Sequence, residues 1–239
     1  MIDSFLTTHY SLLDYMPDLS YEIQNGRLNG TLIAGTDEAG RGPLAGPVVA
    51  AAVIIPQHIP KKLAAAINDS KQLSEKKREE LFPLIIEHCV YGIAECSAQE
   101  IDQINILQAS LLAMKRAVEA LSNKFSDERR VLSNSASPLI SQLSTLLVDG
   151  NKAPVIPNVK TIPIVKGDSK SMSIAAASIL AKVTRDRLMK QLHETFPHYG
   201  WASNMGYPTA SHLDALTQHG ITPHHRKSFG PVKRVMSGE

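Results

Sequence analysis

The stretch 31–55 constrains the fold most, because two apolar runs are joined there by two acids and a glycine-rich turn. The first run covers residues 32–34 and leads to Asp37 and Glu38, and the second covers residues 48–55. Short apolar runs bounded by glycine and proline are typical of buried strands, so we expect strand, loop, strand. Successive strand residues point to opposite faces. The two acids can therefore share a ligand only if the chain bends, which the glycines allow.

Carboxylates beside a glycine-rich loop suit phosphate chemistry with a hard cation. Mg²⁺ and Mn²⁺ prefer oxygen ligands from one or two carboxylates, waters and phosphate groups. Gly40 and Gly42 let backbone N–H groups come close to a nucleic-acid backbone, and Arg41 supplies charge-assisted hydrogen bonds. The alternative is a tight turn with two solvated acids. Taken alone, the adjacent acids and the Gly-x-Gly pattern favour the tight turn.

Composition narrows the class of protein. A chain of 239 residues with 43% hydrophobic residues supports one large domain, or a domain with an appendage. The formal net charge is only +2, so a nucleic-acid surface would have to come from local clustering of charge. There is no apolar run of roughly 20 residues and no secretory pattern. Cys89 and Cys96 flank an extended run that keeps them too far apart for a disulfide, so we expect reduced thiols and a cytoplasmic location.

Two later segments repeat the design of an apolar strand followed by an acid. Asp149 follows the run 145–148, and Asp168 follows the run 161–165. Ser169 or Ser171 can then cap a long alanine-rich helix. Strands and helices alternate along the chain, which predicts an α/β fold with a mixed sheet. In open α/β sheets, functional sites lie at strand ends.

The remaining patterns predict a strand at 90–97, three helices and a loop. A helix capped by Ser74 should run to about His88, with Pro83 bending or shortening it. The capping-box pattern from Ser97 to Glu100 should open an amphipathic helix that runs to residue 121. Residues 122–144, rich in serine and charge, should form a surface loop that is helical only in part, and a short helix should cover residues 211–218.

Asp37, Glu38, Asp149 and Asp168 form a candidate carboxylate cluster. Like charges held together raise one another's pKa unless a positive charge intervenes, so a converging set predicts bound divalent metal. The alternative is a set of separate, solvated turn acids. The residues alone leave both interpretations open.

The run Asp-Glu-Ala-Gly-Arg-Gly-Pro-Leu-Ala-Gly-Pro-Val at 37–48 resembles the motif of the ribonuclease HII family. Residues 166–187 and 69–73 are also similar to that family, and the resemblance extends from about residue 31 to 234. It implies a ribonuclease H-like fold, with a central mixed β-sheet flanked by helices and a small helical C-terminal segment. The expected division is an N-terminal extension at 1–30, a catalytic domain at 31–200 and a C-terminal substrate-binding segment at 201–239.

The resemblance also implies roles for individual residues. The four acids would be both catalytic residues and ligands of two Mg²⁺ or Mn²⁺ ions. The glycine-rich loop would read the ribonucleotide, Tyr207 would pack on the sugar at the RNA–DNA junction, and Lys71 would contact a phosphate. Without the resemblance, Tyr207 is a half-buried turn aromatic and Lys71 belongs to a solvated surface. The loop residues in question are Gly40, Arg41 and Gly42.

The activity implied is endonucleolytic cleavage of the RNA strand of RNA/DNA hybrids, and of duplex DNA on the 5′ side of an embedded ribonucleotide. Products would carry a 3′-hydroxyl and a 5′-phosphate, and the enzyme would be a monomer that does not bind membranes. Alternatives are another nuclease of the same fold and a non-catalytic hybrid-binding protein. Basic residues of one helix and of the tail could together track phosphates, although ordinary solvation is the expected state of any single one: Arg185, Arg187, Lys190, Arg226, Lys227, Lys233 and Arg234.

Overall fold

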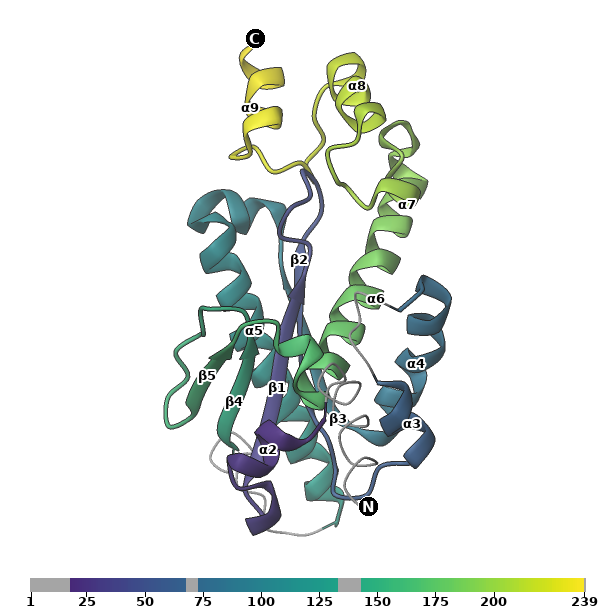
Figure 1. The fold of residues 1–239 in the computed structure, drawn as a ribbon. Coiled ribbons are helices and arrows are strands. Elements are labelled where there is room, and N and C mark those ends of the chain that lie inside the picture. The colour runs from purple at the N-terminus through teal and green to yellow at the C-terminus, as the bar shows by residue number, and fades with distance from the viewer. Residues whose placement is uncertain (1–17, 68–72, 133–142, 239) are drawn as a thin grey trace, which may run out of the picture.

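The computed structural model describes residues 18–67, 73–132 and 143–238 (Figure 1). The strands are β1 (Leu32–Ala39), β2 (Val48–Ile54), β3 (Val90–Cys96), β4 (Leu143–Asp149) and β5 (Lys160–Ile164). The helices are α2 (Ser20–Gln24), α3 (Lys61–Ala66), α4 (Glu75–His88), α5 (Ala98–Leu132), α6 (Met172–Thr195), α7 (Trp201–Asn204), α8 (Ala210–His219) and α9 (Gly230–Ser237). Short 3-10 turns are η1 (Arg27–Asn29), η3 (Gly167–Ser169) and η4 (Pro197–Tyr199).

The five strands form one mixed sheet in the order β3-β2-β1-β4-β5. β1 pairs antiparallel with β2 and parallel with β4, while β2–β3 is antiparallel and β4–β5 is parallel. The predicted α/β fold with a central mixed sheet is therefore confirmed. Because β1 is the middle strand, its C-terminal end lies beside both the β1–β2 loop and the end of β4.

Side chains of β2 alternate between two buried layers, as the period of a strand requires. Val48, Ala50 and Ala52 face the core beneath α5, whereas Ala51 and Val53 face the core beneath α6. α5 covers one face of the sheet, and α6 covers the other together with α3 and α4 (Figure 1). A strand buried on both faces explains why this run reads as continuously apolar.

The approach of α6 to β1 requires a glycine. A Cβ atom on Gly35 would lie 2.3 Å from the backbone nitrogen of Ile174 and 2.4 Å from the Ser173 hydroxyl. No side chain fits at these distances, so Gly35 lets the first turn of α6 rest directly on the central strand. This contact fixes the register of α6 along the sheet.

α5 begins with the predicted capping box, because the Ser97 backbone N–H donates to Glu100 Oε2 at 2.8 Å. The helix differs from the prediction in two ways. It continues to Leu132 rather than ending at residue 121, and it contains a break at Asn105, with φ 66° and ψ 163°. The Asn105 side chain accepts hydrogen bonds from the N–H groups of Leu107 and Gln108 and so caps the longer half.

The predicted caps of two other helices are confirmed. Ser74 accepts a hydrogen bond from the Lys77 N–H at the start of α4, and Ser171 does the same for Ile174 at the start of α6. Helix α4 reaches His88 as predicted, and Pro83 lies inside it without shortening it. No helix among the described residues is long and apolar enough to cross a bilayer.

The C-terminal segment packs around Trp201, which is fully buried with Tyr199 and Leu216. Leu44 and Ala45 of the β1–β2 loop belong to the same cluster, so the C-terminal segment rests on that loop. Helix α8 confirms the predicted short helix. Helix α9 was not predicted, because only Val232 and Val235 of its residues join this cluster and its sequence reads as a basic tail.

Residues 18–22 attach to the start of α6. The Asp18 carbonyl accepts from the Met172 N–H at 2.8 Å, and Glu22 accepts from Ser171 Oγ at 2.8 Å and from the Ser173 N–H at 3.0 Å. The described part of the N-terminal region therefore caps α6 from outside the sheet.

Candidate active site

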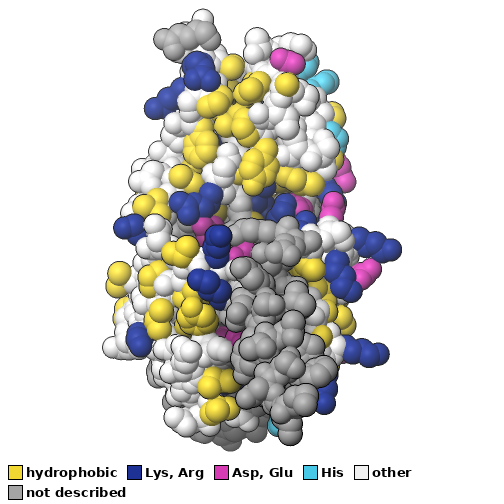
Figure 2. All heavy atoms as spheres, viewed as in Figure 1, with side chains coloured by type: hydrophobic (Ala, Val, Ile, Leu, Met, Phe, Trp, Pro, Cys, Tyr) yellow, Lys and Arg dark blue, Asp and Glu magenta, His cyan; other side chains and the backbone are white. Residues whose placement is uncertain are grey.

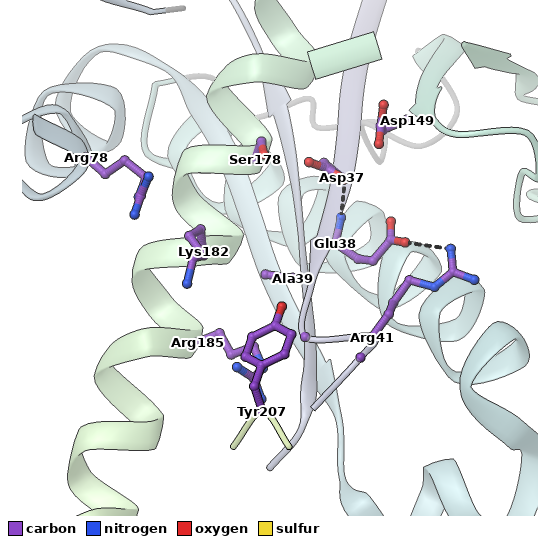
Figure 3. A pocket seen from close by; sticks show the side chains of 12 residues that line it. Asp37, Glu38, Ala39, Arg41, Arg78, Asp149, Ser178, Lys182, Arg185 and Tyr207 are labelled. Carbon is purple, nitrogen blue, oxygen red and sulfur yellow. Dashed lines mark hydrogen bonds and ion pairs between the residues drawn. The ribbon is translucent and has the colours of Figure 1, made fainter. Parts of the chain in front are cut away.

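A cavity of about 500 Å³ opens at the C-terminal end of β1 (Figure 3). Asp37 and Glu38 reach it from β1, and Asp149 reaches it from the end of β4, as expected for two parallel neighbours. The β1–β2 loop and Tyr207 form its rim, and α6 forms the facing wall. The structure thus brings together three of the four predicted carboxylates, the glycine-rich loop and the predicted tyrosine.

Asp37 is the most confined of these acids. Its side chain is 4% exposed, and its backbone pairs with Ala51 of β2. Burial raises the pKa of the Asp37 carboxyl well above its usual range, and the negative charges of Glu38 and Asp149 raise it further. Hydrogen bonds from the Ser178 side chain and the Glu38 N–H oppose this rise. A positive charge bound beside Asp37 would stabilise the ionised form of its carboxyl.

Glu38 leans toward the loop and meets Arg41, with Oε1 at 3.2 Å from the guanidinium (Figure 3). Burial raises the pKa of the Glu38 carboxyl, Arg41 lowers it, and the rise prevails. The other carboxylate oxygen, Oε2, is buried and has no hydrogen-bond partner in the described structure. A buried carboxylate oxygen normally has a partner, so this atom is available as a ligand.

Asp149 and Asp168 lie at the ends of the parallel strands. Asp149 Oδ1 accepts a hydrogen bond from the Gly167 N–H at 2.7 Å, which ties the end of β4 to η3. Asp168 follows Gly167 directly and is buried, but it does not line the cavity. Asp37, Glu38 and Asp149 therefore converge on the cavity as predicted. Asp168 does not line it, but its neighbour Gly167 bonds Asp149.

Mg²⁺ and Mn²⁺ prefer carboxylate oxygens as ligands. The buried Oε2 of Glu38 is such an oxygen and has no hydrogen-bond partner in the described structure. The chemistry of these residues therefore fits a hard divalent cation. Over the described ranges, no group of three or more Asp, Glu, His or Cys side chains is close enough together to hold an ion as it stands. Binding would require small side-chain movements at this site.

The glycine-rich loop lies against the tyrosine. A Cβ atom on Gly42 would lie 3.3 Å from Cε1 of Tyr207, so the ring rests on the loop backbone. The tyrosine side chain is 46% exposed, and its hydroxyl end points toward the cavity (Figure 3). At Gly40 the backbone has φ 98°, and a Cβ atom would lie 1.9 Å from Nε of Arg185. Glycine is thus required at position 40, both because the backbone has a positive φ and because Arg185 leaves no room for a Cβ atom.

Three residues at the cavity were missed as site residues: Arg78 of α4, and Ser178 and Lys182 of α6. Lys182 bonds the Asp186 carboxylate at 2.6 Å, one turn further along α6. Residues 178, 182 and 185 are spaced by four and three, which places them on one helical face, so this spacing was a usable signal. Figure 2 shows acidic side chains in the middle of this face of the molecule, with Lys and Arg side chains on either side.

The expectation that Arg185 and Arg226 track phosphates is wrong, because both side chains are buried and donate to backbone carbonyls. Arg187 pairs with Glu79, and Lys190 bonds Glu75 at 2.6 Å, so both tie α6 to α4. Lys71 lies outside the described residues, and its predicted contact stays a prediction.

Comparisons with known proteins agree with this architecture. The family model described as Ribonuclease HII matches residues 34–232. Ribonuclease HII of Magnetococcus marinus is 51% identical over 222 residues, which cover 92% of this chain and 95% of that protein. Ribonuclease HII 1 of Methylibium petroleiphilum is 53% identical over 207 residues, 86% of this chain and 93% of that protein.

Solved structures give the same result. Ribonuclease H2 from Pyrococcus horikoshii superposes with a TM-score of 0.61 at 26% identity, covering 87% of this chain and 98% of that chain. RNase HII from Archaeoglobus fulgidus, solved in a complex with PCNA, has a TM-score of 0.59 at 25% identity, with 83% and 95% covered. Bst-RNase HIII in complex with Mn²⁺ shares the fold at 20% identity, with a TM-score of 0.66 and 87% and 70% covered.

Proposed function

Because the chain belongs to the ribonuclease HII family, and is therefore an endoribonuclease that cleaves the RNA strand of RNA/DNA hybrids, we propose that it also nicks duplex DNA at single embedded ribonucleotides. The observation that carries this proposal is the contact of Tyr207 with the backbone at Gly42, at the rim of the carboxylate cavity. A bare glycine backbone leaves room for a ribose 2′-hydroxyl, and an aromatic ring beside it can select the neighbouring sugar by shape.

In the proposed reaction, water adds to the phosphorus on the 5′ side of the ribonucleotide. The bond from phosphorus to the 3′ oxygen of the preceding nucleotide breaks, and that oxygen takes up a proton. The products are a 3′-hydroxyl and a 5′-phosphate on the ribonucleotide. A bound divalent ion would supply a Lewis acid that stabilises charge on the phosphate and acidifies the attacking water.

The protein's own residues have distinct proposed roles. Asp37, Glu38 and Asp149 would hold divalent ions, and Asp168, which lies next to this group on η3, would be the fourth ligand. We propose two ions, Mg²⁺ or Mn²⁺, because four carboxylates are more than one such ion needs when it keeps its waters. Arg41 is available for a phosphate contact since its guanidinium is half exposed beside Glu38.

The C-terminal segment contributes to this function by carrying Tyr207. We propose that residues 201–239 form a substrate-binding segment attached to a catalytic domain at 31–200, preceded by the extension at 1–30. The cluster around Trp201 includes Leu44 of the loop, so it holds the C-terminal segment against the loop at the rim of the cavity. The buried, free thiols of Cys89 and Cys96 support a reducing, cytoplasmic location.

The test is cleavage of a labelled DNA duplex that contains one ribonucleotide, with Mg²⁺, with Mn²⁺ and with chelator. We expect a metal-dependent nick immediately 5′ to the ribonucleotide. Cleavage of a continuous RNA/DNA hybrid without that nick would leave the carboxylate site in place and refute the role of Tyr207. Binding of both duplexes without cleavage of either would instead support a non-catalytic hybrid-binding protein.

A further inference from the structure

Two buried arginines lie beneath the glycine-rich loop. Arg226 is 0% exposed and Arg185 is 1% exposed, and neither forms an ion pair with a carboxylate within the described part of the chain. Burying a guanidinium away from water is unfavourable unless its N–H groups are satisfied. Burial lowers the pKa of Arg226 to about 9 and that of Arg185 to about 10, and the charge of Arg185 contributes to the shift of Arg226.

Arg226 is satisfied almost entirely by the β1–β2 loop. Its guanidinium donates to the carbonyls of Gly40 at 2.6 Å, Arg41 at 3.0 Å, Gly46 at 3.0 Å and Pro47 at 3.2 Å. Both ends of the loop are thus bound by one side chain. Because these carbonyls are directed at the buried guanidinium, the first loop residues are held in a single backbone orientation.

Arg185 connects the same loop to the segment that carries Tyr207. It donates to the carbonyls of Ala45 at 3.1 Å, Pro47 at 3.0 Å and Met205 at 3.0 Å. The loop and this segment are also joined directly, since the Leu44 N–H donates to the Gly206 carbonyl at 2.7 Å. The distance between the loop backbone and the tyrosine ring therefore depends on these two side chains.

We propose that Arg226 is a positioning residue for ribonucleotide recognition, because it holds the backbone of Gly40 and Arg41 in the place where Gly42 meets Tyr207. Arg185 completes the arrangement from α6. This inference rests on the proposed reading of the ribonucleotide by the loop and the tyrosine. Neither arginine is proposed to touch the substrate, and both act through the loop backbone.

The test is Arg226→Lys, which keeps the charge but cannot bond four carbonyls at once. The quantity to measure is the ratio of kcat/KM on the single-ribonucleotide duplex to kcat/KM on a continuous RNA/DNA hybrid. We expect this ratio to fall roughly tenfold or more, because small misplacements of recognition groups have effects of that order. The matched control is Arg27→Lys. Arg27 also donates to carbonyls, those of Ile55 and Pro56, but at the opposite end of the β1–β2 pair.

A double-variant cycle separates positioning from general stability. Tyr207→Ala should lower the same ratio, and adding Arg226→Lys to it should lower the ratio little further, because both changes disrupt one contact. Independent, multiplicative losses would overturn the inference, and so would an Arg226→Lys enzyme with an unchanged ratio. If Arg226→Lys does not fold, Arg185→Lys carries the same test and the same refuting outcomes.

The proposed function and this inference fail differently. A wild-type enzyme that cleaves the hybrid but not the single-ribonucleotide duplex refutes the proposed function, whatever the variants do. A wild-type enzyme that nicks the duplex, together with variants that keep its substrate ratio, refutes only the role of the arginines.

Discussion

Asp37 combines a cost in stability with the metal-binding role proposed for it. Burial and two neighbouring acids raise the pKa of its carboxyl, so the ionised form is disfavoured in the metal-free protein. We predict that Asp37→Asn lowers turnover roughly 100-fold or more while hybrid binding is retained. Without added metal, the variant should be more stable than the wild type, because the neutral amide avoids the cost of a buried charge beside two other acids.

Thermal unfolding with and without Mn²⁺ gives a readout that does not depend on activity. The ion should raise the Tm of the wild type more than that of Asp37→Asn, because a ligand that binds the native state stabilises it. Asp214→Asn, at an exposed position of α8, is the matched control. Equal Mn²⁺ responses in all three proteins would contradict a metal role for Asp37.

Among single residues, the acids could be predicted from the sequence better than the arginines packed beside them. Apolar runs predict buried strands, and such runs precede Asp37, Glu38 and Asp149. The roles of Arg185 and Arg226 could not be predicted in this way. Their partners lie about 140 and 180 positions earlier in the chain, and an arginine near a nucleic-acid site suggests phosphate contacts by composition alone.

Among the elements, α6 depends on a cap supplied from outside it. The Glu22 carboxylate accepts from Ser171 Oγ and from the Ser173 N–H and Oγ at the start of the helix. We predict that Glu22→Ala lowers the free energy of unfolding by about 1–3 kcal/mol, because a buried N–H loses its acceptor. Glu22→Gln keeps an acceptor oxygen and should cost less.

Chemical denaturation measures both Glu22 variants. Because Glu22 lies outside the cavity, the kcat of the folded fraction should stay at the wild-type value. Equal stability of Glu22→Ala and the wild type would show that the cap is dispensable.

The elements of the C-terminal segment are joined by a buried histidine pair. His225 Nδ1 accepts from the Thr222 N–H at 2.9 Å, and its Nε2 lies 3.1 Å from Nε2 of His212, whose Nδ1 bonds the Tyr207 carbonyl at 2.9 Å. Burial lowers the pKa of His225 to about 3, helped by the neighbouring histidines. The native protein therefore resists a proton that the unfolded chain accepts below about pH 6.5.

This difference sets the sign of the expected pH dependence. Between about pH 6.5 and pH 3 the unfolded state binds more protons, so stability falls as the pH falls, by at most about 1.4 kcal/mol per pH unit for one proton. We predict that His225→Gln has a shallower decline between pH 7 and pH 5 than the wild type, as measured by urea unfolding. His58→Gln, at an exposed position, should retain the wild-type slope. A wild-type slope in His225→Gln would contradict the prediction.

Sequence patterns predicted where helices begin better than where they break or end. Ser74, Ser97 and Ser171 cap their helices as predicted, because a cap is a local interaction. The break at Asn105 was not predicted, since asparagine inside an amphipathic pattern does not reveal a positive φ. The extension of α5 to Leu132 was also missed in part, because a serine-rich, charged sequence is compatible with both a loop and a helix.

For the whole molecule, the sheet with its two helical layers supplies rigidity, and the C-terminal segment supplies the rim of the cavity (Figure 1). The large apolar side chains that remain exposed in the described structure are spread over several elements rather than gathered on one. We predict a monomer of 26.0 kDa by light scattering after gel filtration. A mass of twice this value at micromolar concentration would contradict the prediction.

The bonds between the β1–β2 loop and Arg226 have a consequence for synthesis of the protein. The loop is made early, but Arg185 and Arg226, whose guanidinium groups donate to the loop carbonyls, emerge from the ribosome about 140 and 180 residues later. Contacts so distant along the chain form late in folding. A growing chain therefore carries Asp37 and Glu38 long before the two arginines that hold the neighbouring loop, so this part of the cavity can be completed only when synthesis is nearly finished.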